Sequence, residues 1–203
     1  MDLFVSKLIS SAVQIVLFSA LPFVWWLLTA RKKESFSRWI GLKKPKKRSG
    51  NGIVKLCVSA TLVFMLIGVF AVKQVGGAKT AAGGFYGMGA SALPAVLVYG
   101  IFNTALPEEI LFRGFFLKRF AARLGVFKAN IVQALAFGLL HAWMFYAVVG
   151  TGKAVLIMIF TGAVAWMLGY VNEMKADGSI LPGWAIHAVS NIFTGILTAF
   201  SII

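Results

Sequence analysis

The stretch LPEEILFRGF, residues 106–115, places two adjacent carboxylates and an arginine inside an apolar run. The whole chain has only six acidic residues, and Glu108 and Glu109 are two of them. Glu109 and Arg113 stand four residues apart with the acid first, which is the favourable helical spacing for an ion pair. Glu108 projects about 100° away around the helix, so it need not share that arginine. The spacing predicts a structural Glu109 paired with Arg113 and a Glu108 that is available for proton chemistry.

Pro107 bears on where this helix begins. Proline is favoured at the first position of a helix. If the helix begins at Pro107, both glutamates lie in its first turn, near the positive end of the helix dipole. The alternative interpretation is that both acids only fix helix packing through Arg113.

The two histidines of the chain, His141 and His187, also lie inside apolar runs. FGLLH puts Phe137 on the helical face of His141, and HAVSN puts Asn191 on the face of His187. A single buried histidine is more often structural than catalytic. Here, however, a glutamate could take a proton from water, one histidine could assist, and a His/Asn pair could donate to an oxyanion. These residue types together predict a hydrolytic site.

A metal is the open question at this predicted site. The zinc-protease motif HExxH is absent, so zinc would need ligands from different helices. The candidates are Glu108, His141 and His187. Cys57 is the only cysteine, which excludes an intrachain disulfide and a cysteine-based metal site.

The composition places these residues in a membrane. Hydrophobic residues make up 60% of the chain, charged residues 13%, and the mean hydropathy is +0.87, well above soluble domains. An apolar run needs roughly 20 residues to cross a hydrocarbon core. We therefore predict an all-α polytopic membrane bundle of about six transmembrane helices, the third of them interrupted at Pro107. The predicted spans are residues 8–30, 53–72, 91–117, 129–149, 153–172 and 180–202.

The net charge of +14 is concentrated in residues 31–55 and 118–128, between apolar runs. This distribution is typical of loops facing an anionic cytoplasmic leaflet and argues against nucleic acid as a partner. It predicts that both termini are extracytoplasmic and that the site, just before the second basic loop, lies on the cytoplasmic side. KKPKKR, residues 43–48, is interpreted as a topology determinant, with specific lipid or partner binding as the alternative. The Gly-rich residues 76–89 are predicted to form a loop.

Three motifs in order, EExxxR at residues 108–113, FxxxH at 137–141 and HxxxN at 187–191, resemble those of the CPBP family. This family comprises the CAAX proteases and bacteriocin-processing enzymes, also called the abortive-infection family of intramembrane proteases. The resemblance covers about residues 90–200. It divides the chain into an N-terminal transmembrane hairpin with a basic cytoplasmic loop, residues 1–75, and a catalytic helical core, residues 90–203.

The resemblance implies a glutamate-dependent intramembrane endopeptidase. Glu108 would activate water, His141 would assist, and His187 and Asn191 would stabilise the oxyanion. Glu109 would hold the motif helix and could support catalysis directly, with Arg113 and Phe137 as structural support. The family is commonly labelled metalloprotease, yet the Glu/His set could work without metal, so zinc stays open. The residues that match the family's motif positions are Glu108, Glu109, Arg113, Phe137, His141, His187 and Asn191.

The substrate implied is a peptide or membrane protein in a bacterial cell membrane. Processing of a bacteriocin or pheromone precursor, or self-immunity to a bacteriocin, are the settings that the resemblance suggests. The alternative is a non-catalytic immunity or scaffold protein that binds a membrane partner. A small transporter using Glu108 and His141 as a proton relay is less favoured, because no inverted repeat is visible.

Overall fold

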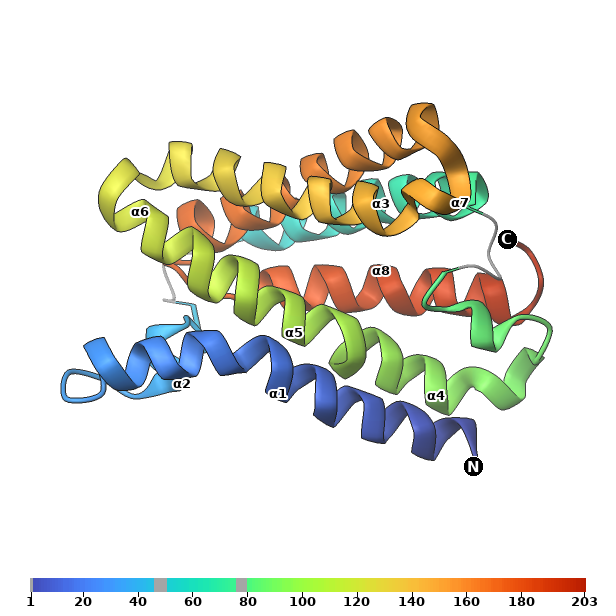
Figure 1. The fold of residues 1–203 in the computed structure, drawn as a ribbon, viewed down its shortest axis with the longest axis horizontal. Helices are drawn as coiled ribbons and strands as arrows, with labels where there is room; N and C mark the ends of the chain where they lie inside the picture. The colour runs from blue at the N-terminus through green and yellow to red at the C-terminus, as the bar shows by residue number, and fades with distance from the viewer. Residues whose placement is uncertain (1, 46–50, 76–79) are drawn as a thin grey trace.

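The computed structural model describes residues 2–45, 51–75 and 80–203, and every regular element in these ranges is helical (Figure 1). The prediction of an all-α fold is confirmed. The elements, in chain order, are α1 (Leu3–Thr29), α2 (Phe36–Trp39), α3 (Asn51–Val75), η2 (Gly83–Phe85), η3 (Gly89–Ala92), α4 (Leu93–Val98), η4 (Tyr99–Ala105), α5 (Leu106–Glu108), η5 (Glu109–Leu117), α6 (Lys118–Leu124), α7 (Val126–Tyr170), η6 (Val171–Lys175) and α8 (Leu181–Ala199).

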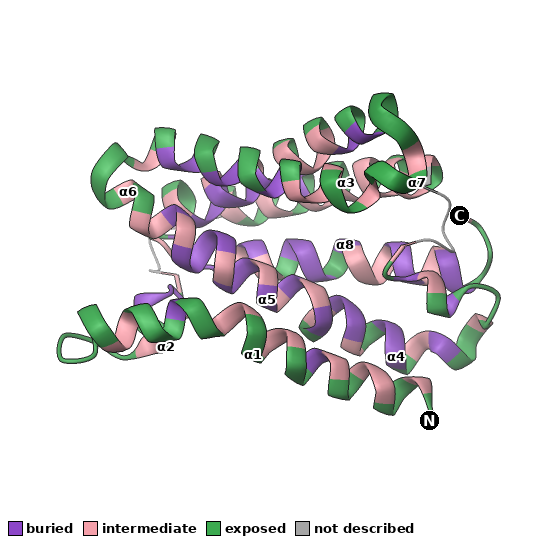
Figure 2. Cartoon of the chain, in the orientation of Figure 1, coloured by how far each residue is buried: buried purple, intermediate pink, exposed green. Residues whose placement is uncertain are grey.

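Four helices of the described residues are long and apolar enough to cross a membrane. They are Leu3–Thr29, Gly52–Gln74, Gly89–Leu124 and Val126–Lys175. Their outward faces are largely exposed, whereas most residues of η5 and about half of those of α8 are buried within the bundle (Figure 2). Apolar side chains that face outward over such lengths require lipid as their solvent. The chain is a multi-pass membrane protein.

The fourth long helix is a helical hairpin. Gly150 in α7 has φ 74° and ψ 172°, a backbone conformation that only glycine adopts readily, and the chain turns back there. The two legs run antiparallel. Asn130 Nδ2 donates to Trp166 O at 2.9 Å, and Gln133 Nε2 donates to Ala165 O at 3.0 Å. With α8, the described residues form about six membrane-length legs, close to the predicted number.

The membrane-length helices are arranged so that those carrying the candidate catalytic residues lie in the middle of the bundle. In Figure 1, α8 and the α4–α5 helix run through the middle, α1 covers one side, and α3 and α7 cover the other. α1 contacts α4, η4 and α5, whereas α3 contacts α7 and α8. Both termini lie at one end of the bundle, and α2 and α6 lie at the opposite end (Figure 1). The described parts of both basic segments are therefore at the same end.

The third long helix differs from the prediction. It continues from Gly89 to Leu124, so Pro107 neither interrupts nor begins it, and the glutamates lie in mid-helix rather than at a dipole end. The reason is a local change of helix type. η4 and η5, on either side of α5, are π-helical, and Leu106 N–H donates to Ile101 O five residues back. A regular α-helix would set the proline ring against a carbonyl four residues back, and the wider π-turn relieves that clash.

Two predictions about the loops fall partly outside the described residues. Lys46 and Arg48 of the KKPKKR run are among the residues that are not described, so its proposed role stays a prediction. Of the Gly-rich stretch 76–89, residues 80–89 are described and form turns and short 3₁₀ segments, as expected for a loop.

At the basic end of the bundle, a group of hydrogen bonds and an ion pair, here called the polar lock, holds neighbouring segments together. Lys118 Nζ donates to Glu173 Oε1 at 2.6 Å and to Gly178 O at 2.7 Å. Ile180 N–H donates to Gly41 O at 2.9 Å. Gly41 has φ +83° and a Cβ there would collide with Gly178 O, so both its conformation and this close approach require glycine. These contacts join α2, α6 and the start of α8, which fixes the helix that carries His187.

Candidate active site

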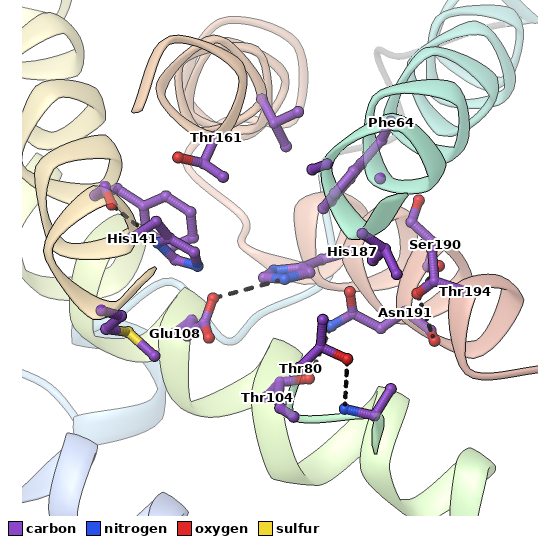
Figure 3. Close-up of a pocket in the computed structure, with 18 of the residues that line it drawn as sticks. Phe64, Thr80, Thr104, Glu108, His141, Thr161, His187, Ser190, Asn191 and Thr194 are labelled. Atoms are coloured by element: carbon purple, nitrogen blue, oxygen red, sulfur yellow. Dashed lines mark hydrogen bonds and ion pairs between the residues drawn. The ribbon is translucent and has the colours of Figure 1, made fainter. Parts of the chain in front are cut away.

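A cavity of about 340 Å³ lies between the helices and receives side chains from α1, α3, η4, α5, η5, α7 and α8. Four of the five predicted catalytic residues line it, namely Glu108, His141, His187 and Asn191, and so does the predicted supporting residue Phe137. Figure 3 shows the side chains of Glu108, His141 and His187 directed toward the same space. The other polar lining residues are Gln14, Thr80, Tyr99, Asn103, Thr104, Thr161, Ser190 and Thr194.

Glu109 and Arg113 form the predicted pair behind the cavity wall. Arg113 Nη1 lies 3.2 Å from Glu109 Oε1, and both side chains are fully buried. The Arg113 guanidinium also lies 4.7 Å from the centroid of the Phe137 ring, a cation–π contact. Phe137 in turn packs 4.3 Å, centroid to centroid, from the His141 ring. The buried pair is thereby linked to one of the cavity's histidines.

His187 connects the two glutamates, an arrangement that sequence reasoning did not predict. Its Nδ1 lies 3.3 Å from Glu109 Oε1 and its Nε2 lies 3.6 Å from Glu108 Oε2 (Figure 3). The residue is only 4% exposed, and the Phe64 ring covers it at 5.3 Å. Because the Glu109 carboxylate accepts hydrogen bonds, it favours the proton on Nδ1 and holds the ring plane.

His141 presents its other nitrogen to the cavity. Its Nδ1 lies 2.9 Å from Phe137 O, and a carbonyl can only accept, so Nδ1 carries the hydrogen. Nε2 is then the acceptor of the neutral ring. The side chain is half-buried and lines the cavity. His141 can accept a hydrogen bond, or a proton, from a molecule bound there.

Asn191 is held by a residue that sequence reasoning missed. Its Nδ2 donates to Thr104 Oγ1 at 2.7 Å, and the Thr104 hydroxyl donates to Tyr99 O at 3.3 Å. Tyr99 lies five residues before Thr104 in the π-helical η4, so the π-turn supplies the carbonyl at this position. One hydrogen of the Asn191 amide remains for a group in the cavity.

Asn172 is a second residue missed from the sequence. It is fully buried, its Nδ2 donates to Glu109 Oε2 at 3.2 Å, and its Oδ1 accepts from Gly183 N–H at 2.8 Å. A Cβ on Gly183 would lie 2.5 Å from Asn172 Nδ2, so this close approach needs glycine. Asn172 therefore ties the carboxylate that orients His187 to the beginning of α8. An asparagine at the end of an apolar run was the available signal.

The described residues show no assembled zinc site. In the described part of the chain, no three His, Cys, Asp or Glu side chains come together as a metal-binding group. Nδ1 of His141 bonds Phe137 O and Nδ1 of His187 faces Glu109, which leaves Nε2 as the nitrogen that each ring presents to the cavity side. Glu108, His141 and His187 thus line one cavity without forming a ligand set, and no step of the chemistry below uses a metal.

Comparison with known proteins gives one match. A family model described as type II CAAX prenyl endopeptidase, Rce1-like, matches residues 89–193, which is more than half of the 203 residues. The matched range includes every residue from Glu108 to Asn191 discussed above. Searches of curated proteins and of solved structures gave no match.

Proposed function

The chain belongs to the Rce1-like family of type II CAAX prenyl endopeptidases, and we propose that it hydrolyses a peptide bond inside its membrane-embedded cavity. The observation that carries the proposal is the convergence of Glu108, His141, His187 and Asn191 on one space. Two carboxylates and two histidines placed among apolar membrane helices are costly, and such groups typically mark functional sites.

Glu108 is the proposed general base. Its carboxylate lines the cavity and lies 3.6 Å from His187 Nε2, longer than a hydrogen bond, so an oxygen is free to bind water. His141 Nε2 would accept the second hydrogen of that water and orient it. Glu108 takes a proton as the water oxygen attacks the carbonyl carbon. It then gives that proton to the leaving nitrogen as the carbon–nitrogen bond breaks.

Asn191 and His187 are proposed to stabilise the negative oxygen of the tetrahedral intermediate. Asn191 has one amide hydrogen left after its bond to Thr104. In this role His187 would carry a second proton, on Nε2, besides the proton on Nδ1 that Glu109 favours, and the 3.6 Å separation from Glu108 leaves that second proton able to turn to the oxyanion. Donors held in place by neighbours are worth more than donors that must reorganise. Thr104 and Glu109 provide that support for Asn191 and His187 respectively.

The proposed substrate is a peptide or membrane-protein segment with apolar side chains. The cavity walls include Phe64, Phe112, Leu140 and Ile157, which would bind such side chains. We propose a bacterial setting, in which the enzyme processes a bacteriocin or pheromone precursor or protects its own cell from a bacteriocin. Because the family is described as CAAX prenyl endopeptidases, prenylated CAAX sequences are a further substrate class to include in tests.

The test is cleavage of a mixed set of quenched-fluorescent peptides, with and without a CAAX terminus, by purified protein in detergent. We expect Glu108→Gln, His141→Ala and His187→Ala each to lower the rate by about 10²–10⁴, the range for general acid–base groups. Glu34→Gln is the matched control, since Glu34 is an exposed acid outside the cavity. Wild-type rates in all three cavity variants would refute the assignment.

The competing function is a non-catalytic scaffold or immunity protein. It predicts that wild-type protein cleaves none of the peptides and that the cellular phenotype survives Glu108→Gln. Loss of the phenotype in Glu108→Gln at normal protein abundance would instead support catalysis.

A further inference from the structure

Gln14 is a polar residue of α1 that the proposed chemistry does not use. Its side chain lines the cavity, together with Phe18 one turn further along the same helix. The whole of α1 lies outside residues 89–193, the range that matches the family model. Part of the cavity wall is therefore supplied by a helix that this match does not cover.

Three side-chain contacts fix the register of α1 against the helix that carries Glu108. The contacting pairs are Lys7 with the Tyr99 ring, Ser10 with Asn103, and the Trp25 ring with the Phe115 ring. The two helices run in the same direction (Figure 1), so the residue numbers of both increase together from pair to pair. Gln14, one turn after Ser10, therefore lies beside the turn that follows Asn103 and leads to Glu108.

The Gln14 amide has no hydrogen-bond partner among the described residues. By contrast, the hydroxyls of Ser11 and Thr29 on the same helix donate to carbonyls one turn back, each at 2.7 Å. Short hydroxyl side chains can be satisfied by their own helix in this way, whereas the longer Gln14 faces the cavity. A polar group at membrane depth without a protein partner is costly and typically marks a functional position.

A primary amide is complementary to a peptide group. Its oxygen accepts and its NH₂ donates, so it can form two hydrogen bonds with one peptide group of an extended backbone. We propose that Gln14 binds a backbone peptide group of the substrate, close to the bond that is cut at Glu108. The proposal rests on the proposed function. The apolar walls bind substrate side chains with little directional preference, and the Gln14 amide would fix the register of the backbone between them.

Kinetic constants of Gln14→Met test this role. Methionine keeps the unbranched length of glutamine but lacks the amide. We expect KM to rise by about 10- to 30-fold with kcat within about two-fold of wild type, as for two lost hydrogen bonds that substrate and transition state make equally. Ser11→Ala is the matched control and should leave both constants unchanged. Ser11 is a buried polar residue of the same helix that does not line the cavity.

An ester in the substrate identifies the peptide group that Gln14 binds. Each peptide group flanking the scissile bond is replaced in turn by an ester, which removes the N–H donor and weakens the carbonyl acceptor. We expect one of these esters to raise the KM of wild type by about 10-fold and to have no further effect in Gln14→Met. If every ester has the same effect in both proteins, Gln14 does not bind the backbone.

A binding measurement separates this proposal from the proposed function. The same peptides, carrying one fluorophore, are titrated into Glu108→Gln protein with and without Gln14→Met. If wild type cleaves no peptide while Gln14→Met weakens binding by about 10-fold, hydrolysis is refuted and the role of Gln14 stands. If wild type and Gln14→Met cleave with equal KM, only the role of Gln14 is overturned. Absence of both cleavage and binding overturns both.

Folded yield and melting temperature complete the test. We expect Gln14→Met to equal or exceed wild type in both, because methionine suits a membrane helix better than an amide does. A lower yield or melting temperature would identify Gln14 as a structural residue and overturn the proposal.

Discussion

At the scale of single residues, Arg113 has an unusual environment. It is fully buried and pairs with Glu109, yet in the described structure its Nε, Nη1 and Nη2 have no hydrogen-bond acceptor in suitable geometry. The pair and the Phe137 ring are what offset the cost of burying its charge. Glu108 has no such role, since it lies on the cavity side of the same helix.

This difference predicts opposite effects on stability. Arg113→Ala leaves Glu109 as a buried charge with weaker partners, and we expect a loss of about 3–5 kcal/mol of unfolding free energy. Glu108→Ala should leave the folded yield close to that of wild type. Thermal unfolding in detergent and monodisperse yield measure both. Equal, undiminished yields would contradict the structural role given to the pair.

Asn172 provides a second prediction at this scale. Asn172→Ala removes one hydrogen bond to Glu109 and one from Gly183 N–H, both in buried surroundings. Leaving buried groups unsatisfied costs about 1–3 kcal/mol. We also expect a lower kcat, because Glu109 orients His187. Asn172→Leu, of similar volume, is the companion variant. Unchanged stability and unchanged kcat in both variants would show that Asn172 does not position the site.

At the scale of elements, two departures from regular helix create the site. The π-turns around Pro107 let one helix present Thr104 and Glu108 to the cavity and Glu109 to the buried side. The turn at Gly150 lets α7 return and bring Thr161 and Val164 to the opposite wall. The break predicted at Pro107 rested on the preference of proline for the first position of a regular α-helix, whereas the structure accommodates the proline with a widened turn inside the helix.

The α7 hairpin gives a prediction with an internal control. A Cβ on Gly138 would lie 2.5 Å from Met158 O, and a Cβ on Gly152 would meet no atom within 4 Å. We expect Gly138→Ala to destabilise the protein by about 1–3 kcal/mol, as overpacking does. Gly152→Ala should be neutral or stabilising by up to about 1 kcal/mol, since alanine favours helix. Thermal unfolding of both variants checks this, and equal effects would show that the two legs are not in close contact.

At the scale of the whole molecule, hydrophobic length predicted the helices well. The spans predicted at 129–149 and 153–172 are the two legs of α7, and 180–202 corresponds to α8. What could not be predicted was contact between distant helices. The bond from Asn172 to Glu109 joins residues 63 apart, and that from Asn191 to Thr104 joins residues 87 apart. Such pairs depend on packing, which spacing within one helix does not report.

Metal removal is a prediction for the whole enzyme. Because the described donors form no ligand set, we expect full cleavage activity after exhaustive treatment with a chelator. Elemental analysis of the purified protein accompanies the assay. Activity that is lost on chelation and restored only by zinc would contradict this account and reinstate Glu108, His141 and His187 as ligands.

The central claim is that the two adjacent glutamates have separate tasks, with Glu108 reacting and Glu109 supporting. The most direct measurement is the single-turnover cleavage rate of Glu108→Gln beside its melting temperature. We predict a rate lower by about 10²–10⁴ with an unchanged melting temperature, as for a general base on the cavity side. Cleavage by Glu108→Gln at the wild-type rate would contradict the claim.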